Sequence, residues 1–174
     1  MRGAFARFVG QVLVALLVAA EWSSAARAAD EWSFLKWQMT PQQAKAALAA
    51  RGFKSLPLGE DDYDMYAIPF ESERHGFVDV SLPLLRFERK IGNVKTVDFL
   101  LFREDRLDMI AVSTPPDRPC SVLFGPMKNL HGKPVPAPLA DGTPTSVYHW
   151  RFGGKLARLK LEQDLPCRML IWPG

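Results

Sequence analysis

The hydrophobic pattern first becomes regular at residues 41–51, where it has the 3.6-residue period of a helix. The apolar stripe consists of Ala44, Ala47 and Leu48. Thr40 is a suitable N-cap, and Gln43 completes a Thr-x-x-Gln capping box with it. Gly52 can adopt the left-handed conformation that ends a helix. We therefore predict a helix from Pro41 to Arg51 that packs closely on a sheet.

After this helix the hydrophobic period changes from 3.6 residues to 2, which is typical of strands. Short alternating or apolar runs predict four strands: Met65–Pro69, Phe77–Leu82, Thr96–Phe102 and Leu107–Ser113. The charged run from Arg103 to Arg106 separates the last two and predicts a tight hairpin turn. A second helix is expected from Pro119 to Leu130, with Gly132 as its stop. Gly125-Pro126 inside this helix predicts a break or kink, because proline lacks the amide hydrogen.

The clearest hairpin signal is Gly153-Gly154, which lies between the strand candidates Ser146–Phe152 and Lys155–Glu162. A two-residue primed turn at these glycines fixes the register of the two strands. In that register Trp150 lies opposite Ala157 and Tyr148 lies opposite Leu159 on one face of the hairpin. His149 lies opposite Arg158 on the other face. A last strand is predicted from Cys167 to Trp172.

Helices and strands therefore follow one another twice in the same order, a helix and then several strands. This order predicts an α+β fold with a mainly antiparallel sheet and helices packed on one face. It also suggests a duplicated helix–β-meander unit. We expect residues 29–174 to form a single globular domain.

Residues 1–28 have the features of a secretory signal peptide. Arg2 and Arg7 supply a positive start, and the mostly apolar run Phe8–Ala20 is shorter than the ~20 residues that a membrane-spanning helix needs. Ala26-Arg27-Ala28 fits the small-residue pattern of a cleavage site. We expect a protein in the periplasm or outside the cell, without a stable membrane anchor after cleavage.

Loss of this peptide removes three arginines and one glutamate, and lowers the net charge from +3 to +1. A nearly neutral domain gives no electrostatic reason to expect nucleic-acid binding. Cys120 and Cys167 would both reach an oxidising compartment, where a disulfide between them is the economical expectation.

The segment Trp37-Gln38-Met39-Thr40-Pro41-Gln42-Gln43, followed by Ala47-Leu48 and Gly52-Phe53, carries a family resemblance. It resembles the opening helix of small periplasmic helix-plus-β-meander proteins, such as the BamE-like lipoproteins of outer-membrane assembly and the β-lactamase-inhibitory-protein fold. Unlike the lipoprotein members, this chain has no cysteine for lipidation before the domain. The resemblance implies a non-enzymatic module that binds other proteins.

Candidate chemistry is sparse. The chain contains no G-x-S-x-G or H-E-x-x-H motif. Four carboxylates in Glu60–Asp64 could hold calcium, but Met65 stands where an EF-hand loop needs glycine, so we expect a solvated acidic loop. An extended chain would place Glu71, Glu73 and His75 on one side, where they could bind zinc. We favour a polar edge strand there and expect no metal.

Aromatic side chains suggest a binding surface before the first helix, formed by Trp32, Phe34 and Trp37. Trp37 is expected to pack over the sheet. Trp32 is expected to be exposed, as the anchor for a protein partner or a sugar ring. The working hypothesis is an exported, non-enzymatic domain without a cofactor that binds another envelope protein. The alternatives are a small metal-dependent hydrolase built on Glu71, Glu73 and His75, an inhibitor of a hydrolase, and a purely structural envelope protein.

We predict that the exported protein begins at Ala29 and carries a disulfide between Cys120 and Cys167. Intact-mass measurement of protein from the periplasm, before and after reduction, checks both expectations. Retention of the first 28 residues would contradict the signal peptide, and labelling of either thiol without reduction would contradict the disulfide.

Overall fold

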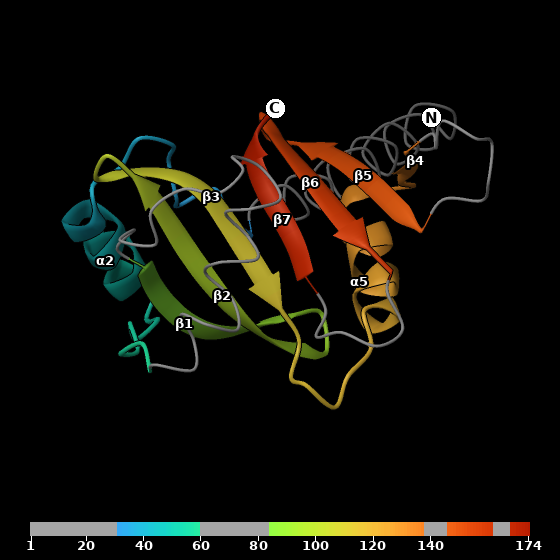
Figure 1. The fold of residues 1–174 in the computed structure, drawn as a ribbon, viewed down its shortest axis with the longest axis horizontal. Coiled ribbons are helices and arrows are strands. Elements are labelled where there is room, and N and C mark those ends of the chain that lie inside the picture. Colours follow the sequence, from blue (N-terminus) through green and yellow to red (C-terminus); the bar gives the residue numbers. More distant parts are fainter. Residues whose placement is uncertain (1–30, 60–83, 138–145, 162–167) are drawn as a thin grey trace, which may run out of the picture.

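The computed structural model describes residues 31–59, 84–137, 146–161 and 168–174, which form an antiparallel sheet with helices over one face (Figure 1). The two helices are α2 (Pro41–Ala50) and α5 (Ser121–His131). The seven strands are β1 (Leu84–Ile91), β2 (Val94–Arg103), β3 (Arg106–Ser113), β4 (Val135–Pro136), β5 (Val147–Phe152), β6 (Lys155–Lys160) and β7 (Arg168–Pro173). The predicted α+β class is confirmed.

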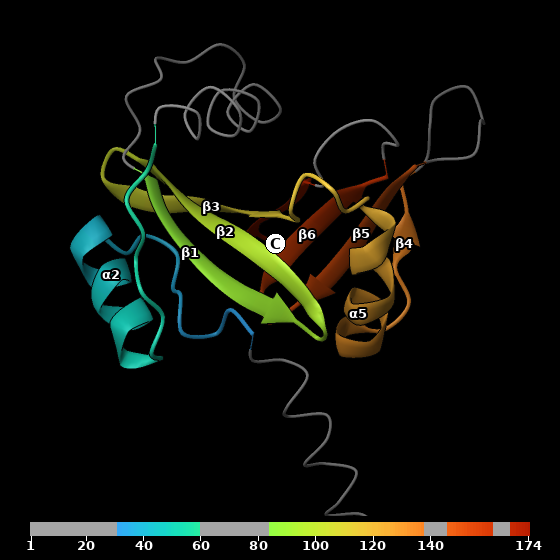
Figure 2. The same ribbon diagram turned by 90° about the horizontal axis from the view of Figure 1, so that it is seen from below.

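The sheet has the strand order β1-β2-β3-β7-β6-β5-β4, with antiparallel pairing throughout. Two three-stranded meanders, β1–β2–β3 and β5–β6–β7, meet where β3 pairs with β7. A helix precedes each meander in the chain, and both helices lie on the same side of the sheet (Figure 2). A duplication of one unit stays a prediction. The strands expected at Met65–Pro69 and Phe77–Leu82 lie outside the described residues.

The local signals at α2 act as predicted. The Thr40 hydroxyl accepts a hydrogen bond from the Gln43 backbone, and the Gln43 side chain accepts one from the Thr40 backbone. At the other end Gly52 has a φ of 78°. The Gly52 N–H donates to the Ala49 carbonyl and the Phe53 N–H to the Leu48 carbonyl, the two bonds of a Schellman motif. Both ends of the helix are therefore fixed by sequence-local hydrogen bonds.

The two predicted hairpins also form. Trp150 pairs with Ala157, Tyr148 with Leu159 and His149 with Arg158, as the Gly153-Gly154 turn predicts. In the β2–β3 turn Glu104 and Asp105 have φ values of 48° and 57°, so two residues other than glycine occupy the left-handed region.

Two features of the fold differ from the sequence-based expectations. Strand β1 was not predicted, because its charged residues interrupt the alternating pattern. Of the break or kink expected at Gly125-Pro126, the break is wrong, since α5 continues through Pro126, and the kink stays a prediction. The Pro126 ring lies against Gly92 of the β1–β2 turn, where a Cβ would come within 3.4 Å of it. We attribute the continuity of the helix to this tertiary packing, which outweighs local preference.

The main core lies between the sheet and the two helices. Ala44 and Leu48 from α2 and Leu123 and Met127 from α5 pack there against inward-facing strand residues. The opposite face of the sheet has a smaller apolar cluster, formed by Phe99, Leu101, Met109, Ala111 and Leu170. Successive strand residues alternate between the two clusters, as the pleat requires.

Replacement of the α2 N-cap tests the local account of this helix. We expect Thr40→Ala to lower the free energy of unfolding by about 1 kcal/mol, because the Gln43 N–H loses its acceptor. Urea denaturation measures the change, and Thr40→Ser is the matched control that keeps the hydroxyl. Equal loss in both variants would contradict a capping role.

Candidate functional site

Trp32 is buried, so the expectation of an exposed Trp32 is wrong. Its relative exposure is 1%, and its indole lies in the main core under the sheet. The indole Nε1–H donates a hydrogen bond to Oδ2 of Asp98 at 3.0 Å. The indole N–H was expected to favour the surface, but Asp98 provides its hydrogen-bond acceptor inside the core.

Asp98 is the centre of this buried polar cluster, which we call the Trp32–Arg89–Asp98 cluster. Asp98 is completely buried on the helix side of β2. Its Oδ2 lies 2.8 Å from Nε of Arg89, and its Oδ1 accepts a hydrogen bond from the Thr96 hydroxyl at 3.0 Å. The carboxylate thus has a cation and two neutral donors as partners, which is what a buried charge requires.

Arg89 also ties down the segment before α2. Its Nη1 donates to the Glu31 carbonyl at 3.0 Å, and its Nη2 lies 3.3 Å from the Glu31 carboxylate. The guanidinium carbon is 4.1 Å from the centre of the Trp32 ring, in a cation–π contact. One arginine on β1 therefore holds Glu31, Trp32 and Asp98 together.

His131, the last residue of α5, closes the cluster on the side of the second meander. Its ring stacks on Phe152 with centroids 3.8 Å apart, and on Trp32 at 6.2 Å. Burial, and to a smaller degree the charge of Arg89, lower the pKa of His131 from 6.5 to about 4. This residue is therefore neutral at physiological pH.

The pKa values of the two carboxyl groups beside Arg89 are raised, whereas the pKa of His131 is lowered. Burial raises the pKa of Asp98, and the charge of Arg89 and the hydrogen bonds of its neighbours oppose that effect. Burial likewise raises the pKa of Glu31. Asp98 and Trp32 are inaccessible to solvent, and their contacts hold segments of the chain together.

Phe34 and Trp37, the other members of the expected aromatic surface, are half-buried. Phe34 stacks on Phe53 with centroids 5.8 Å apart, and the guanidinium of Arg51 lies 5.6 Å from its ring centre. Trp37 packs against the main core, as expected. The three aromatics therefore do not form one exposed patch.

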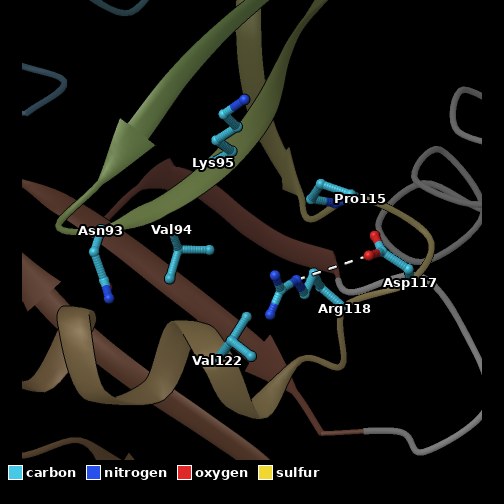
Figure 3. A pocket seen from close by; sticks show the side chains of 7 residues that line it. All are labelled: Asn93, Val94, Lys95, Pro115, Asp117, Arg118 and Val122. Atoms are coloured by element: carbon cyan, nitrogen blue, oxygen red, sulfur yellow. Dashed lines mark ion pairs between the residues drawn. The ribbon is translucent and has the colours of Figure 1, made fainter.

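A groove opens instead at the β1–β2 turn, between this turn and the beginning of α5 (Figure 3). Its volume is about 600 Å³, within the range of ligand sites. It is lined by Asn93, Val94, Lys95, Pro115, Asp117, Arg118 and Val122. We call this the turn groove.

The walls of the turn groove are fixed by local structure. Gly92, with a φ of 59°, begins the β1–β2 turn and packs on Pro126 of α5. In the loop before α5 the Thr114 hydroxyl donates to the Arg118 carbonyl at 2.8 Å, and the Arg118 N–H donates to the Pro115 carbonyl. These contacts place the preformed loop opposite the turn.

The lining of the turn groove combines apolar and charged groups. Arg118 extends into it between Val94 and Val122 (Figure 3). Asn93 borders it from the turn, and Lys95 of β2 lines its rim with its ammonium pointing away from Val122. Asp117 lies 3.8 Å from Arg118 in an exposed ion pair, which contributes little energy. A ligand with an apolar part and an anionic or amide group would therefore find partners here.

One catalytic spacing escaped the sequence analysis. Ser33-Phe34-Leu35-Lys36 matches the S-x-x-K pattern of serine–lysine enzymes. In the structure these residues belong to a turn closed by the Leu35 N–H and the Trp32 carbonyl, and Ser33 and Lys36 are exposed.

The proposed metal ligands Glu71, Glu73 and His75 and the acidic run Glu60–Asp64 lie outside the described residues. Within residues 31–59, 84–137, 146–161 and 168–174 no group of three His, Cys, Asp or Glu side chains could hold a metal ion. Cys120 is buried beside α5, and the described part of the chain has no free cysteine thiol. Cys167 lies outside it, so the disulfide stays a prediction.

Comparisons of the chain with protein-family models, with curated proteins and with solved structures find no match. The resemblance of the segment around Trp37–Gln43 to periplasmic helix-plus-meander proteins therefore stays a hypothesis. None of the helices in the described residues has the length and apolar character needed to cross a bilayer.

Sequence reasoning missed Arg89, Asp98 and the turn groove. A signal for Asp98 was present, because the pattern of β2 places it on the same face as Leu100 and Phe102. A lone carboxylate facing the core requires a cation. The cation could not be assigned, since Arg89 lies in the strand that was not predicted.

We expect Arg89→Ala to lower the free energy of unfolding by about 3–5 kcal/mol, because it leaves Asp98 buried without its counter-ion. The double change Arg89→Met, Asp98→Asn should cost clearly less, since it removes both charges. The carboxamide oxygen of Asn can still accept from the Trp32 indole, and its NH2 can donate to the Thr96 hydroxyl. Urea denaturation compares them. A double variant as unstable as Arg89→Ala would contradict the ion-pair account.

The lowered pKa of His131 makes the free energy of unfolding depend on pH in a direction that can be derived. The lowered pKa means that the unfolded chain binds a proton at this residue between pH 6.5 and about 4 while the folded chain does not. Protonation of His131 therefore does not lower the free energy of unfolding above pH 6.5, and it lowers this free energy progressively as the pH falls towards 4.

His131→Phe keeps the stack on Phe152 and removes the titration. We expect the stability of the wild type relative to this variant to decrease on acidification. The raised pKa values of Glu31 and Asp98 act with the opposite sign, but they act in both proteins and cancel in the difference. A difference that does not change with pH would contradict the lowered pKa of His131.

Proposed function

We propose that this protein is an exported, non-enzymatic binding domain, and that the turn groove holds a segment of another envelope protein. The single observation that supports this proposal most is the groove itself, a preformed concave site of about 600 Å³ with apolar and charged lining. Such mixed lining fits a short polypeptide segment, whose side chains and backbone amides offer both kinds of contact.

The distribution of fixed polar groups supports a binding role over catalysis. Arg89 and Asp98 join the N-terminal segment to β1–β2, and His131 joins that segment to α5 through its stack on Trp32. The turn groove in contrast presents Arg118, an exposed side chain suited to an ion pair with a ligand.

Export is part of the same proposal. The signal-peptide features of residues 1–28 would bring the domain to the envelope, where its partner would be another exported protein. A disulfide at Cys120 would then stabilise the beginning of α5, which forms one wall of the turn groove.

Site-specific photo-crosslinking in cells tests this function. A photoreactive amino acid at Asn93, an exposed residue of the groove, should give a discrete adduct with an envelope protein, identified by mass spectrometry. The matched control is the same amino acid at Lys45, an exposed position on α2. Equal adducts from both positions, or none from Asn93 in a stably exported chain, would contradict the proposal.

A further inference from the structure

The guanidinium of Arg118 is the group of the turn groove that can bind an anion. The side chain is exposed and extends into the groove between Val94 and Val122 (Figure 3). Its ion pair with Asp117 is made through Nε, which lies 3.8 Å from Oδ2 of that residue. The two Nη atoms point away from Asp117 and into the groove (Figure 3). Two such parallel donors can bind both oxygens of one carboxylate.

The beginning of α5 adds to the positive potential beside Arg118. The N-cap residue, Cys120, makes no side-chain cap hydrogen bond, and the first turn of the helix contains no acidic residue. The positive end of the helix dipole is therefore not compensated by a side chain of α5 itself. Val122 belongs to this first turn and lines the groove. A carboxylate bound to Arg118 would therefore also lie close to a helix N-terminus.

Apolar surface flanks the guanidinium directly. Val94 and Val122 lie on its two sides, and both are half-buried, so each can offer part of its side chain to a ligand. Val94 is held in place because it packs against the main core. A matching ligand therefore needs a carboxylate and an apolar group next to each other.

We infer that the turn groove binds the C-terminal residue of a partner polypeptide, with its carboxylate on Arg118 and an apolar side chain against Val94 and Val122. This inference rests on the binding function proposed above. In a C-terminal residue the carboxylate and the side chain are attached to the same Cα, so both can reach their partners in the groove at once.

An internal segment of a partner matches the groove less well. Successive side chains of an extended segment point to opposite sides, and those on one side are about 7 Å apart. An acidic and an apolar side chain of such a segment are therefore not presented together. A free lipid acid lacks a peptide backbone, whereas the exposed carboxamide of Asn93 can both donate to and accept from backbone amides.

Fluorescence anisotropy with the full exported chain tests this inference. The probe is a labelled tetrapeptide that ends in leucine and has a free carboxylate. The first reference peptide is its C-terminal amide, and the second is this amide with glutamate before the leucine. We expect the free acid to bind about tenfold more tightly than either amide, because it alone has a carboxylate and an apolar side chain on one carbon.

Two variants locate the binding of the free acid in the groove. Arg118→Gln should weaken it about tenfold, because a charge-assisted hydrogen-bonded pair is lost. Val122→Ala, which leaves the charge unchanged, should weaken it as well, since part of the apolar wall is removed. The matched control is Arg151→Gln on β5, an exposed arginine outside the groove lining, which should leave the affinity unchanged.

Three results would overturn the inference. They are equal binding of the free acid and its amide, equal loss of affinity in Arg118→Gln and Arg151→Gln, and displacement of the probe by octanoate as readily as by unlabelled peptide. Crosslinking from Asn93 gives an adduct with any partner segment that occupies the groove, whether terminal or internal. It can therefore succeed where the free acid shows no preference, so the two proposals fail separately.

Discussion

The ion pair between Arg89 and Asp98 is the interaction on which the arrangement of this domain depends. Two charges in a core are tolerated only when they meet each other and further hydrogen-bond partners. Here those partners come from different parts of the chain, since Glu31 and Trp32 precede α2 and Thr96 lies on β2. His131, which ends α5, stacks on Trp32. The need to satisfy one buried carboxylate therefore specifies how these segments meet.

The turn groove is a consequence of that arrangement. Arg89 lies on β1 shortly before the Gly92 turn, so the cluster anchors the hairpin that forms one wall. His131 anchors the end of α5, and Pro126 in the middle of that helix packs against Gly92. The contact between Gly92 and Pro126 therefore joins the two walls directly, and Trp32, which contacts both Arg89 and His131, joins them indirectly. A preformed groove of this kind binds without the entropic cost of ordering its walls.

The parts of the fold that depend on local interactions could be predicted from the sequence. The capping box of α2 and the Gly153-Gly154 hairpin use neighbouring residues only, and both formed with the expected partners. Strand β1, the continuity of α5 and the burial of Trp32 depend on residues distant in sequence. For Trp32 the deciding partner, Asp98, is 66 positions away, so no local pattern could show that its indole is satisfied in the core.

The measurement that tests the central claim most directly asks whether the turn groove depends on the buried ion pair. It is the yield of the adduct from a photoreactive group at position 93 in exported chains with the neutral pair Arg89→Met, Asp98→Asn. The account predicts a clearly lower yield than in the wild type, because Arg89 and Asp98 no longer fix the hairpin that forms one wall of the groove. An undiminished yield from the neutral pair would contradict the claim that the arrangement of the domain depends on this ion pair.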